Sequence, residues 1–455
     1  MSDARPENAE LGFCLVTGGA GYLGRHLVQE LLRRGCRVRA FDRDPIPVSH
    51  ERLEVAQGDV RDLSAIRKAC DGIDTVFHTA AVLDFRRFPG RDAWERSSSI
   101  NVGGVENVLR ACRDAGVQRL VHTSTNNVTL EGPVIDGDET WPYARKPKDP
   151  YTATKILAER RVLEANGADG LLTCAIRPGG IYGPGEQLIF PRITEQCARG
   201  RFRAIIGDGS AKSDNTYIEN LVDGHLEAAR HLVPGSPVGG QAYFVTDGAP
   251  VNYFEFFRPY VADLGLEFPT LRLPTWPFHA VMWLWELAGR WLPIPAPPMT
   301  TLELRKLVVS HYSRIEKARR DFGWTPKVSP EEAARRCIPY VRELYAKVER
   351  VDRPHWAWWI AIPFGMGLLA VLAFSPAAHA LWAERVTSWT PRGLLQGIFV
   401  WAALLHAYKG MKAVRMAERA GLHQTSMAWG WQTLLLGFPS LGLLEKRVAR
   451  MARPG

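Results

Sequence analysis

The sequence offers little that would bind a metal or a nucleic acid. Its seven cysteines show no CxxC pair and no metal-ligand spacing in 455 residues, so no metal site is predicted. Several of these cysteines fall within apolar, strand-like runs, which is typical of buried free thiols in a reducing compartment. The formal net charge of +9 comes without a nucleic-acid motif or an aromatic–basic ladder, so a nucleic-acid partner is not expected. An anionic membrane face is the better partner for the excess charge.

Apolar, signal-like sequence is missing at the start, and charged residues are missing near the end. Residues 1–11 are polar and charged, so no signal peptide is expected. No Asp, Glu, Lys or Arg occurs in 355–383, 393–408 or 420–444. The first stretch is long enough to cross ~30 Å of hydrocarbon and has tryptophans at both ends, whereas the second is borderline. These stretches predict a transmembrane helical tail over residues 354–445 and a multi-pass protein with its remainder in the cytoplasm. A soluble helical bundle is the alternative.

The basic residues around these stretches conflict with three full spans. One basic group follows the second stretch and another follows the third, and each favours a cytoplasmic position. Three spans would place the two groups on opposite sides, so one segment is re-entrant or one rule is broken. The basic residues are Lys409, Lys412, Arg415, Arg419, Lys446, Arg447, Arg450 and Arg453.

The chain is organised around a glycine-rich turn, TGGAGYLG at residues 17–24. It lies between the strand-like run 13–16 and apolar residues at helical spacing. Gly18 permits a tight turn, Gly21 admits a pyrophosphate, and Gly24 allows close packing of a helix on a strand. The phosphates would bind free N–H groups at the helix N-terminus, including those of Tyr22 and Leu23. This pattern predicts a dinucleotide site, and a glycine-rich turn without a ligand is the alternative.

An acidic residue follows at the distance expected for a ribose contact. Asp42 lies 18 residues past Gly24, at the end of a second strand-like run. Its carboxylate would accept from a 2′-hydroxyl and repel a 2′-phosphate, which favours NAD, although Arg43 leaves NADP possible. Asp59 and Val60 end a third strand, where an adenine ring would lie. A helix cap is the alternative for an acid there, and Asp62 fits that role better.

Strand and helix signals alternate over residues 12–124 and predict a doubly wound parallel sheet with right-handed crossovers, that is, an α/β fold. We expect a dinucleotide-binding domain over residues 12–177 and a smaller mixed substrate region over 178–350. A fourth strand runs into small residues that leave space for a cofactor, and a long helix is expected to begin at Asn101. A sixth strand closes in a loop that could border the nicotinamide. The further cofactor candidates are Thr79, Ala80, Ala81, Asn101 and Pro178.

A second constellation, YTATK at residues 151–155, opens the next predicted helix. Tyr151 and Lys155 are four residues apart and share a helical face. A phenol has a pKa near 10, and a neighbouring ammonium would favour the phenolate. Tyr151 could then take a proton from an alcohol, while Lys155 also donates to the nicotinamide ribose. A hydroxyl from the fifth strand, Thr125 or Ser124, would hold the substrate oxygen.

The order of these motifs resembles that of the extended short-chain dehydrogenases/reductases. TGGAGYLG, GDVRD, HTAA, YTATK and RPGGIYGPG occur in the same sequence as in those proteins. The later segments, among them KARRDFGWTP at 317–326, are similar to the 3β-hydroxysteroid dehydrogenase family, including the sterol 4-carboxylate 3-dehydrogenases (decarboxylating). The resemblance covers residues 12 to about 345 and implies catalytic Tyr151 and Lys155. Counting back from Val128 matches Thr125 to the family's catalytic hydroxyl, beside Ser124.

The resemblance implies oxidation of a 3β-hydroxy steroid or sterol with NAD. The expected partners are this lipid-like substrate and the membrane, and a homodimer is left open. An aromatic stretch at 276–285 would form an ordinary core helix, a wall of an apolar pocket, or a face that dips into the bilayer. Isomerisation of a double bond would need an additional proton shuttle that spacing does not reveal. Two alternatives remain: an NADPH-dependent reductase of a 3-oxo lipid such as a 2-alkyl-3-oxoalkanoate, and a non-catalytic, cofactor-sensing membrane scaffold.

Overall fold

The computed structural model describes residues 11–86, 90–147, 149–289, 291–292, 297, 299–349 and 351–451. The chain divides into two compact units. The N-terminal unit extends to Tyr345, and the C-terminal unit begins at Ala346. The two units are described separately below.

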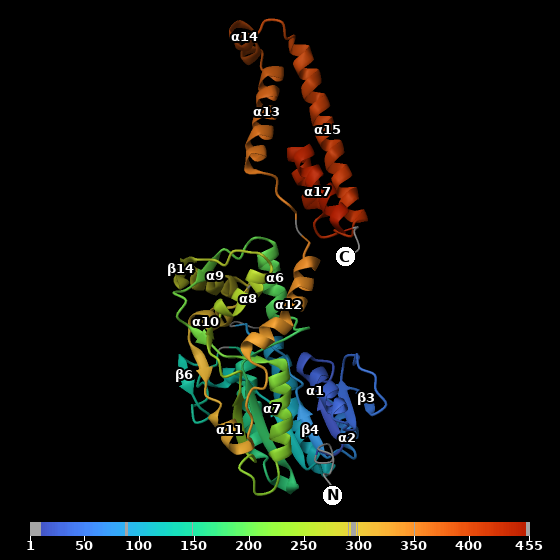
Figure 1. Cartoon of the computed structure of the whole chain (residues 1–455), viewed down its shortest axis with the longest axis vertical. Coiled ribbons are helices and arrows are strands. Elements are labelled where there is room, and N and C mark those ends of the chain that lie inside the picture. The colour runs from blue at the N-terminus through green and yellow to red at the C-terminus, as the bar shows by residue number, and fades with distance from the viewer. Residues whose placement is uncertain are drawn as a thin grey trace. The chain divides into compact units, whose positions relative to one another are not determined.

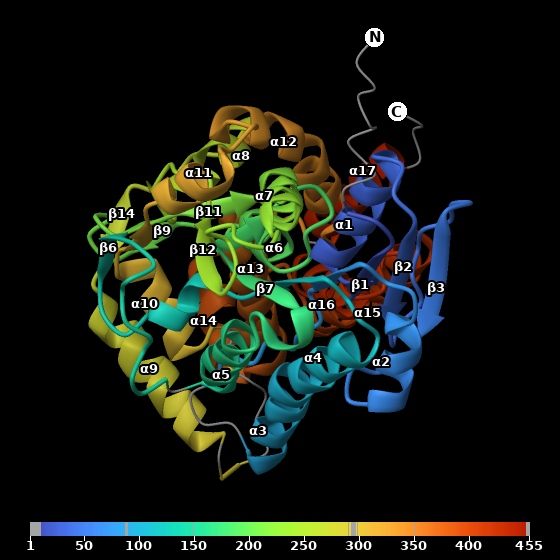
Figure 2. The ribbon, with the colours of Figure 1, turned by 90° about the horizontal axis from the view of Figure 1, so that it is seen from below.

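The N-terminal unit is built on a seven-stranded parallel sheet (Figures 1 and 2). The strand order, β12-β7-β5-β4-β1-β2-β3, reverses direction between β1 and β4. In doubly wound sheets ligands bind at such a reversal, outside the carboxyl ends of the strands. The predicted α/β fold is therefore confirmed. The strands are β1 (Cys14–Thr17), β2 (Val38–Asp42), β3 (Leu53–Gln57), β4 (Thr75–His78), β5 (Arg119–Thr123), β7 (Leu172–Pro178) and β12 (Gln241–Val245).

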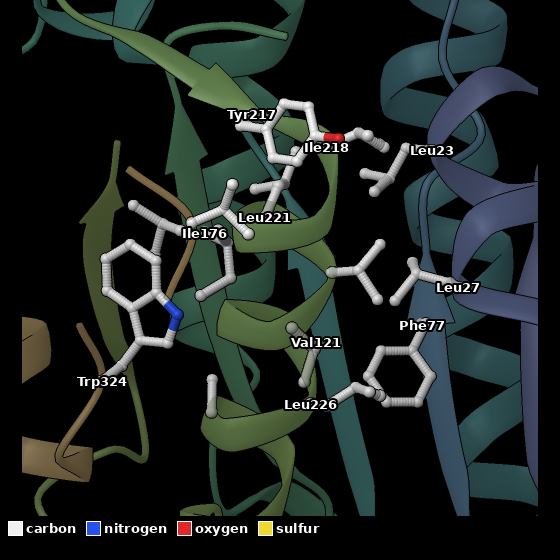
Figure 3. Packing of buried hydrophobic residues seen from close by; sticks show 14 of the residues in the cluster. Leu23, Leu27, Phe77, Val121, Ile176, Tyr217, Ile218, Leu221, Leu226 and Trp324 are labelled. Atoms are coloured by element: carbon white, nitrogen blue, oxygen red, sulfur yellow. The ribbon is translucent and has the colours of Figure 1, made fainter. Parts of the chain in front are cut away.

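Helices cover both faces of this sheet, and each face has its own apolar core. On one face Leu23 lies near Ile218 and Leu27 lies near Phe77, within one cluster that also holds Val121 and Leu226 (Figure 3). The helices there are α1 (Tyr22–Arg33) and α7 (Ile218–His231). The helices of the opposite face are α2 (Leu63–Cys70), α4 (Gly104–Asp114) and α5 (Pro150–Glu164). Both cores hold the carboxyl ends of the strands in fixed register.

The segment before α4 differs from the expectation. A short helix, α3 (Arg91–Ser98), comes first, and a π-helical turn over Ser99–Gly103 joins it to α4. Asn101 lies inside this turn and does not begin a helix. Local π geometry is frequent at functional positions, because it redirects one side chain out of the helical register.

Smaller elements surround the carboxyl edge of the sheet and confirm a mixed second region. A four-stranded mixed sheet has the order β13-β10-β15-β6, and two-stranded sheets pair β11 with β8 and β14 with β9. These strands are β6 (Val134–Gly137), β8 (Gly180–Tyr182), β9 (Ala204–Ile206), β10 (Lys212–Ser213), β11 (Asn215–Tyr217), β13 (Val251–Asn252), β14 (Leu271–Leu273) and β15 (His311–Ser313). The helices are α6 (Ile189–Ala198), α8 (Arg258–Asp263), α9 (Thr275–Ala288), α10 (Thr301–Val308), α11 (Glu316–Phe322) and α12 (Pro330–Lys347).

The C-terminal unit is helical, and its helices do not follow the three uncharged stretches. The first stretch is interrupted because Ser375 caps a new helix that begins at Pro376. The third is interrupted at Gly437, whose φ is +64°. Among the described residues, α13 is the one helix that is long and apolar enough to cross a membrane. Only 11% of the residues in its most apolar 18-residue stretch are buried. The helices are α13 (Trp356–Phe374), α14 (Pro376–Arg385), α15 (Arg392–Arg419), α16 (Ser426–Leu436) and α17 (Phe438–Met451).

Candidate active site

The glycine turn lies at the end of β1, where the strand order reverses. Gly18 has a φ of +76°, and a Cβ on it would lie 2.8 Å from the backbone nitrogen of Ala80. A Cβ on Gly24 would lie 2.0 Å from the carbonyl oxygen of Gly18. Helix α1 begins at Tyr22 and has no side-chain cap. Its N-cap residue, Gly21, therefore offers no side chain to the first N–H groups, and uncapped N–H groups at a helix start favour anions.

Asp42 is fixed against this turn by two backbone amides. One carboxylate oxygen accepts from Ala20 N at 3.0 Å, and the other accepts from Asp44 N at 3.0 Å. The Arg43 guanidinium donates to the Asp44 carboxylate at 3.3 Å. A negative charge is thus held beside the glycine turn while the neighbouring cation is paired elsewhere.

Asp59 and Val60 follow β3 near the same edge of the sheet. The Asp59 carboxylate accepts from Arg61 Nη2 at 2.7 Å, and this hydrogen bond lowers the pKa of Asp59. Asp62 caps α2 by accepting from Ser64 N and Ala65 N, as expected. Val60 is buried.

The remaining cofactor candidates lie after β4 and β7. Thr79 donates from Oγ1 to the carbonyl oxygen of Thr17 at 2.8 Å, which ties β4 to β1. Ala80 and Ala81 follow it in the chain. The backbone of Ala80 lies directly against Gly18, so a side chain at position 18 would collide with it. Pro178 ends β7 at the same edge of the sheet.

Asn101 contacts the protein backbone from the π-helical turn. Its Oδ1 accepts from Val82 N at 2.8 Å, and its Nδ2 donates to Val82 O at 3.1 Å. The same Nδ2 donates to Thr154 Oγ1 at 2.9 Å. Asn101 therefore joins the loop after β4 to α5, the helix that carries Tyr151.

Tyr151 is the second residue of α5 and is buried. Asp149 caps the helix by accepting from Thr152 N at 2.8 Å, and Pro150 occupies its first position. The Phe85 ring meets the Tyr151 ring edge-on at 5.0 Å. Burial raises the pKa of Tyr151 to about 12, while a hydrogen bond with Thr125 acts in the opposite direction.

Two adjacent hydroxyls follow β5, and they face different groups. Thr125 faces the phenol of Tyr151, and its Oγ1 also accepts from Asn127 N at 3.3 Å. Ser124 lies beside Glu159, whose pKa it helps to lower. Within the described residues, Ser124 Oγ has no partner inside hydrogen-bond distance. Of the two hydroxyls, Thr125 is thus the one that acts on the pKa of Tyr151.

Lys155 lies one helical turn after Tyr151, but its amine is directed at β5. Its Nζ donates to Thr123 O at 2.5 Å and contacts His122 Nε2 at 3.1 Å. Burial lowers the pKa of Lys155 to about 7. The sequence predicts that Lys155 lowers the pKa of the phenol, but burial dominates and that pKa is raised instead.

Comparison with known proteins identifies this arrangement. The model of the 3-beta hydroxysteroid dehydrogenase/isomerase family matches residues 15–275. The chain belongs to this family. It is 44% identical over 348 residues to a 3 beta-hydroxysteroid dehydrogenase/Delta 5-->4-isomerase from Mycobacterium tuberculosis, covering 76% of this chain and 94% of that protein. The resemblance stated from the motifs is confirmed, and the chain is an oxidoreductase of the 3β-hydroxysteroid dehydrogenase family.

Further relatives extend the comparison. A 3-beta-hydroxysteroid dehydrogenase from Mycolicibacterium neoaurum is 42% identical, covering 74% of this chain and 93% of that protein. Human short-chain dehydrogenase/reductase family 42E member 1 is 40% identical, covering 70% and 85%. The solved structure of MoeE5 in complex with UDP-glucuronic acid and NAD is 26% identical, covers 73% of this chain and 99% of that chain, and has a TM-score of 0.56. The tail, residues 357–446, matches the model of Transmembrane protein 254, which with α13 indicates membrane association.

Three buried histidines near Lys155, His78, His122 and His225, were not predicted from the sequence as residues of the dehydrogenase site. His78 and His122 stack with ring centroids 5.3 Å apart. Thr17 Oγ1 lies 2.7 Å from His78 Nδ1, and Thr123 Oγ1 lies 2.8 Å from His225 Nε2. Two of the histidines interrupt the ends of apolar strands, His78 as the last residue of β4 and His122 as the last but one of β5, and that polar interruption was the available signal.

These histidines predict a loss of stability in mild acid. Burial lowers the pKa of His78 to about 3 and that of His225 to about 4, so the folded protein binds fewer protons than the unfolded chain below pH 6.5. Stability should therefore fall as pH drops from about 6.5 towards 4, by roughly 1.4 kcal/mol per histidine per pH unit. Urea unfolding of the full chain in detergent at several pH values measures this slope. His225→Gln should reduce it, and an unchanged slope would contradict the assignment.

A buried ion pair supports the site from behind. Arg177 Nη2 donates to Glu159 Oε1 at 2.5 Å, Arg177 Nε donates to both carboxylate oxygens at 3.1 Å, and Tyr143 donates to the same carboxylate at 2.7 Å. Glu159 belongs to α5 and Arg177 to β7, and both are fully enclosed. The pair fixes the helix that presents Tyr151 against the sheet.

Proposed function

We propose that this protein is a membrane-tethered, NAD-dependent dehydrogenase that oxidises the 3β-hydroxyl of a steroid or sterol to a 3-ketone. The observation that carries the proposal is the meeting of Tyr151 with Thr125, one helical turn from Lys155, in a chain 44% identical to a mycobacterial 3β-hydroxysteroid dehydrogenase/isomerase. We assign Tyr151 as the catalytic base, Thr125 as the group that orients the substrate oxygen, and Ser124 as its neighbour. This site belongs to a dinucleotide-binding domain, residues 12–177, that is completed by later strands.

The residues around the glycine turn fit a dinucleotide. A Cβ would fill the space at Gly18 and Gly24, and the uncapped α1 N-terminus offers N–H groups to a pyrophosphate. The cofactor-binding set is Gly18, Gly21, Tyr22, Leu23, Gly24, Asp42, Asp59, Val60, Thr79, Ala80, Ala81, Asn101, Lys155 and Pro178. NAD is the cofactor because Asp42 places a carboxylate where a 2′-phosphate would add a second negative charge. When bound, NAD supplies the hydride acceptor.

The protein's own part in the reaction is proton transfer and orientation. Thr125 holds the substrate hydroxyl, and Tyr151 takes its proton as the hydride leaves the same carbon. Because the pKa of Tyr151 is about 12 in the protein alone, the phenolate needs positive charge nearby. When protonated, Lys155 has three N–H groups, of which two are directed at Thr123 and His122, so one remains for the nicotinamide ribose.

An Asp42→Asn substitution tests the cofactor assignment. It keeps an oxygen acceptor for Ala20 N but removes the negative charge, so the preference for NAD over NADP should fall by about 10–100-fold, the range for a hydrogen bond to a charged group. Steady-state kinetics with both cofactors measure the ratio. Glu51→Gln, which removes an exposed negative charge without touching Asp42 or the Arg43–Asp44 pair, is the matched control. An unchanged ratio in Asp42→Asn would remove the argument for NAD.

A lipid-like substrate is supported by the apolar surface that leads to Tyr151. Trp276 and Trp291 are 72% and 76% exposed, and α9 presents further large apolar side chains. Glu286 of α9 accepts from Thr301 Oγ1 of α10 at 2.8 Å. Lys306, also on α10, lies 4.9 Å from the Phe85 ring, which contacts Tyr151. Helix α10 thus reaches the aromatic neighbour of the phenol and α9 packs on α10, and we assign both to the wall of a substrate region over residues 178–350.

The finer substrate choice follows from chemistry. If the substrate carries a carboxylate beta to the new ketone, carbon dioxide can leave with little further help, as in a sterol 4-carboxylate. Comparing lipids from cells with the wild-type protein and with Tyr151→Phe tests the class. Accumulation of 3-hydroxy steroids or sterols in the variant supports the proposal. Altered long-chain 3-oxo lipids with an unchanged sterol pool would favour an NADPH-dependent reductase instead.

The tail is proposed to place this site at a membrane, with the dehydrogenase unit in the cytoplasm and more than one crossing. All seven cysteines are free and buried, which suits a reducing compartment. A Transmembrane protein 254 region with one long apolar helix supports the membrane location. A lipid substrate would then be taken up where it is dissolved.

A further inference from the structure

Helix α15 changes character along its length. Between Arg392 and Lys409 it contains no charged residue, yet its large side chains are exposed. Beyond Lys409 it carries several basic residues, and its small residues Ala413 and Ala417 are buried. The exposed apolar and aromatic residues of the first half are Leu394, Ile398, Val400, Trp401, Leu404 and Tyr408. An apolar, exposed half and a charged, packed half require different surroundings.

The apolar half of α15 pairs with α13. The two helices run side by side in Figure 1, with α14 at the end where they are connected. Arg392 Nε and Gln396 Nε2 donate to the carbonyl oxygen of Ala373 at 3.0 and 3.1 Å, which satisfies the end of α13. The Phe374 and Phe399 rings lie 5.4 Å apart. The pair is a helical hairpin closed at the α14 end.

The short helices α16 and α17 lie at the opposite end of this hairpin. The Glu349 carboxylate accepts from Gln424 N at 2.8 Å and from Thr425 N at 3.1 Å. Gln432 Nε2 donates to the carbonyl oxygen of Asp352 at 2.9 Å. Both acidic residues precede α13 in the chain, so α16 lies beside the start of α13.

Further contacts hold α17 and the end of α16 at the same level. The Trp358 and Phe438 rings lie 5.4 Å apart, and Lys412 Nζ donates to Glu445 at 3.3 Å. His406 Nδ1 lies 2.8 Å from the carbonyl oxygen of Leu434, so this histidine has an interhelical partner. Helix α16 therefore reaches no further than about one turn into the apolar half of α15, at His406.

We propose that the bilayer covers α13 and the apolar half of α15 as a two-span hairpin, and that α16 and α17 remain on the side from which α13 enters. This inference rests on the proposed membrane location of the tail and not on the catalytic residues. The 19 residues of α13 extend about 28 Å, close to the ~30 Å of hydrocarbon, whereas the 11 of α16 extend about 16 Å. The 16 uncharged residues of α15 extend about 24 Å, and the long side chains of Arg392 and Lys409 at their ends can reach the headgroups. Helix α16 is too short to cross.

Two spans also resolve the conflict in the basic residues. With α13 and the apolar half of α15 as the crossings, the charged half of α15 and the C-terminal helix α17 return to the cytoplasmic side. Lys409, Lys412, Arg415 and Arg419 then share that side with Lys446 and Arg447, as the positive-inside rule requires. The segment around α14, with Trp382 and Trp389, lies at the far face.

A third crossing through residues 420–444 would separate a buried polar cluster. Gln432 Nε2 lies 3.1 Å from Ser440 Oγ, and Thr433 Oγ1 lies 2.8 Å from the same oxygen. These bonds exist because the chain reverses at Gly437. Straightening α16 and α17 into one helix would break them and leave three polar groups facing hydrocarbon.

Single cysteines labelled in sealed vesicles test this topology. We would introduce Ala115→Cys, Ser388→Cys, His423→Cys and Ala449→Cys, four exposed positions, into the full chain. The native cysteines are buried, so the wild-type chain is the blank for a membrane-impermeant maleimide. On sealed vesicles the maleimide should reach Ala115→Cys, His423→Cys and Ala449→Cys from the same side of the membrane. From that side it should label Ser388→Cys only after the vesicles are opened.

Two results would overturn the inference. Labelling of His423→Cys and Ala449→Cys from opposite sides would demonstrate a third span. Labelling of all four from one side, with release of the protein at high pH, would exclude any crossing and remove the membrane location itself. Hydride transfer measured on the same vesicles separates either failure from a failure of the proposed dehydrogenase activity.

Discussion

Replacing Tyr151 with phenylalanine is expected to lower kcat for 3β-hydroxysteroid oxidation by about 10²–10⁴-fold, the contribution of a positioned general base. The ring would still fill its buried position against Phe85, so only the hydroxyl that faces Thr125 is lost. Binding of NAD, measured by quenching of protein fluorescence, should be unchanged because the glycine turn is untouched. Single-turnover hydride transfer gives the chemical rate directly.

Tyr143→Phe is the matched control for this variant. Tyr143 lies in the same region, but its hydroxyl donates to Glu159 and not towards Thr125. Its loss should reduce stability by about 1 kcal/mol, a typical hydrogen bond, while kcat changes little. Equal losses of kcat in both variants would mean that the region, and not the Tyr151 hydroxyl, limits the reaction.

Arg177→Met should lower the free energy of unfolding by about 3–5 kcal/mol, because it leaves the enclosed Glu159 carboxylate without its cation. The Tyr143 hydroxyl alone cannot replace the two guanidinium nitrogens that donate to this carboxylate. We expect a correspondingly lower denaturation midpoint in urea, and reduced activity as α5 loses its anchor to β7. Circular dichroism followed through a urea titration measures the effect.

The double variant Glu159→Leu with Arg177→Met separates charge from packing. Replacing both partners by apolar residues of similar volume removes the unpaired charge, so much of the stability should return. If the double variant is as unstable as Arg177→Met, the packing of these side chains and not their charge determines the free energy of unfolding at this position. Restored stability with activity still reduced would show that the pair also positions Tyr151.

The fold and the outline of the site could be predicted because they depend on local pattern. Apolar strands that end in glycine or small residues specify β1 and β4, and the helical spacing of Leu23, Leu27 and Leu31 specifies α1. Parallel strands bring their carboxyl ends together, so Gly18 and Thr125 must share one edge. No distant contact has to be known for these conclusions.

The sequence could not decide features that depend on contacts between distant segments. Which of Ser124 and Thr125 faces Tyr151 depends on how the chain leaves β5, and Ser124 lies beside Glu159 instead. The amine of Lys155 was expected to act on Tyr151, but His122 and Thr123 lie closer. Asn101 was expected at a helix start, yet it bonds Val82 and Thr154 from a π-helical turn.

The tail illustrates the same limit. Composition marked three uncharged stretches correctly but could not show that the third reverses at Gly437, because apolar residues favour a buried and a membrane helix alike. Contacts such as those of Glu349 with Gln424 and of His406 with Leu434 settle where α16 lies within the C-terminal unit.

The most direct measurement is the fate of a deuterium at C3 of a 3β-hydroxysteroid incubated with the purified full-length protein and NAD. The proposed chemistry predicts that the label appears in the reduced cofactor, with one equivalent of 3-ketone formed, and that Tyr151→Phe slows the formation of both by about 10²–10⁴-fold. Unlabelled cofactor, or turnover only in the direction of 3-oxo lipid reduction with NADPH, would contradict it.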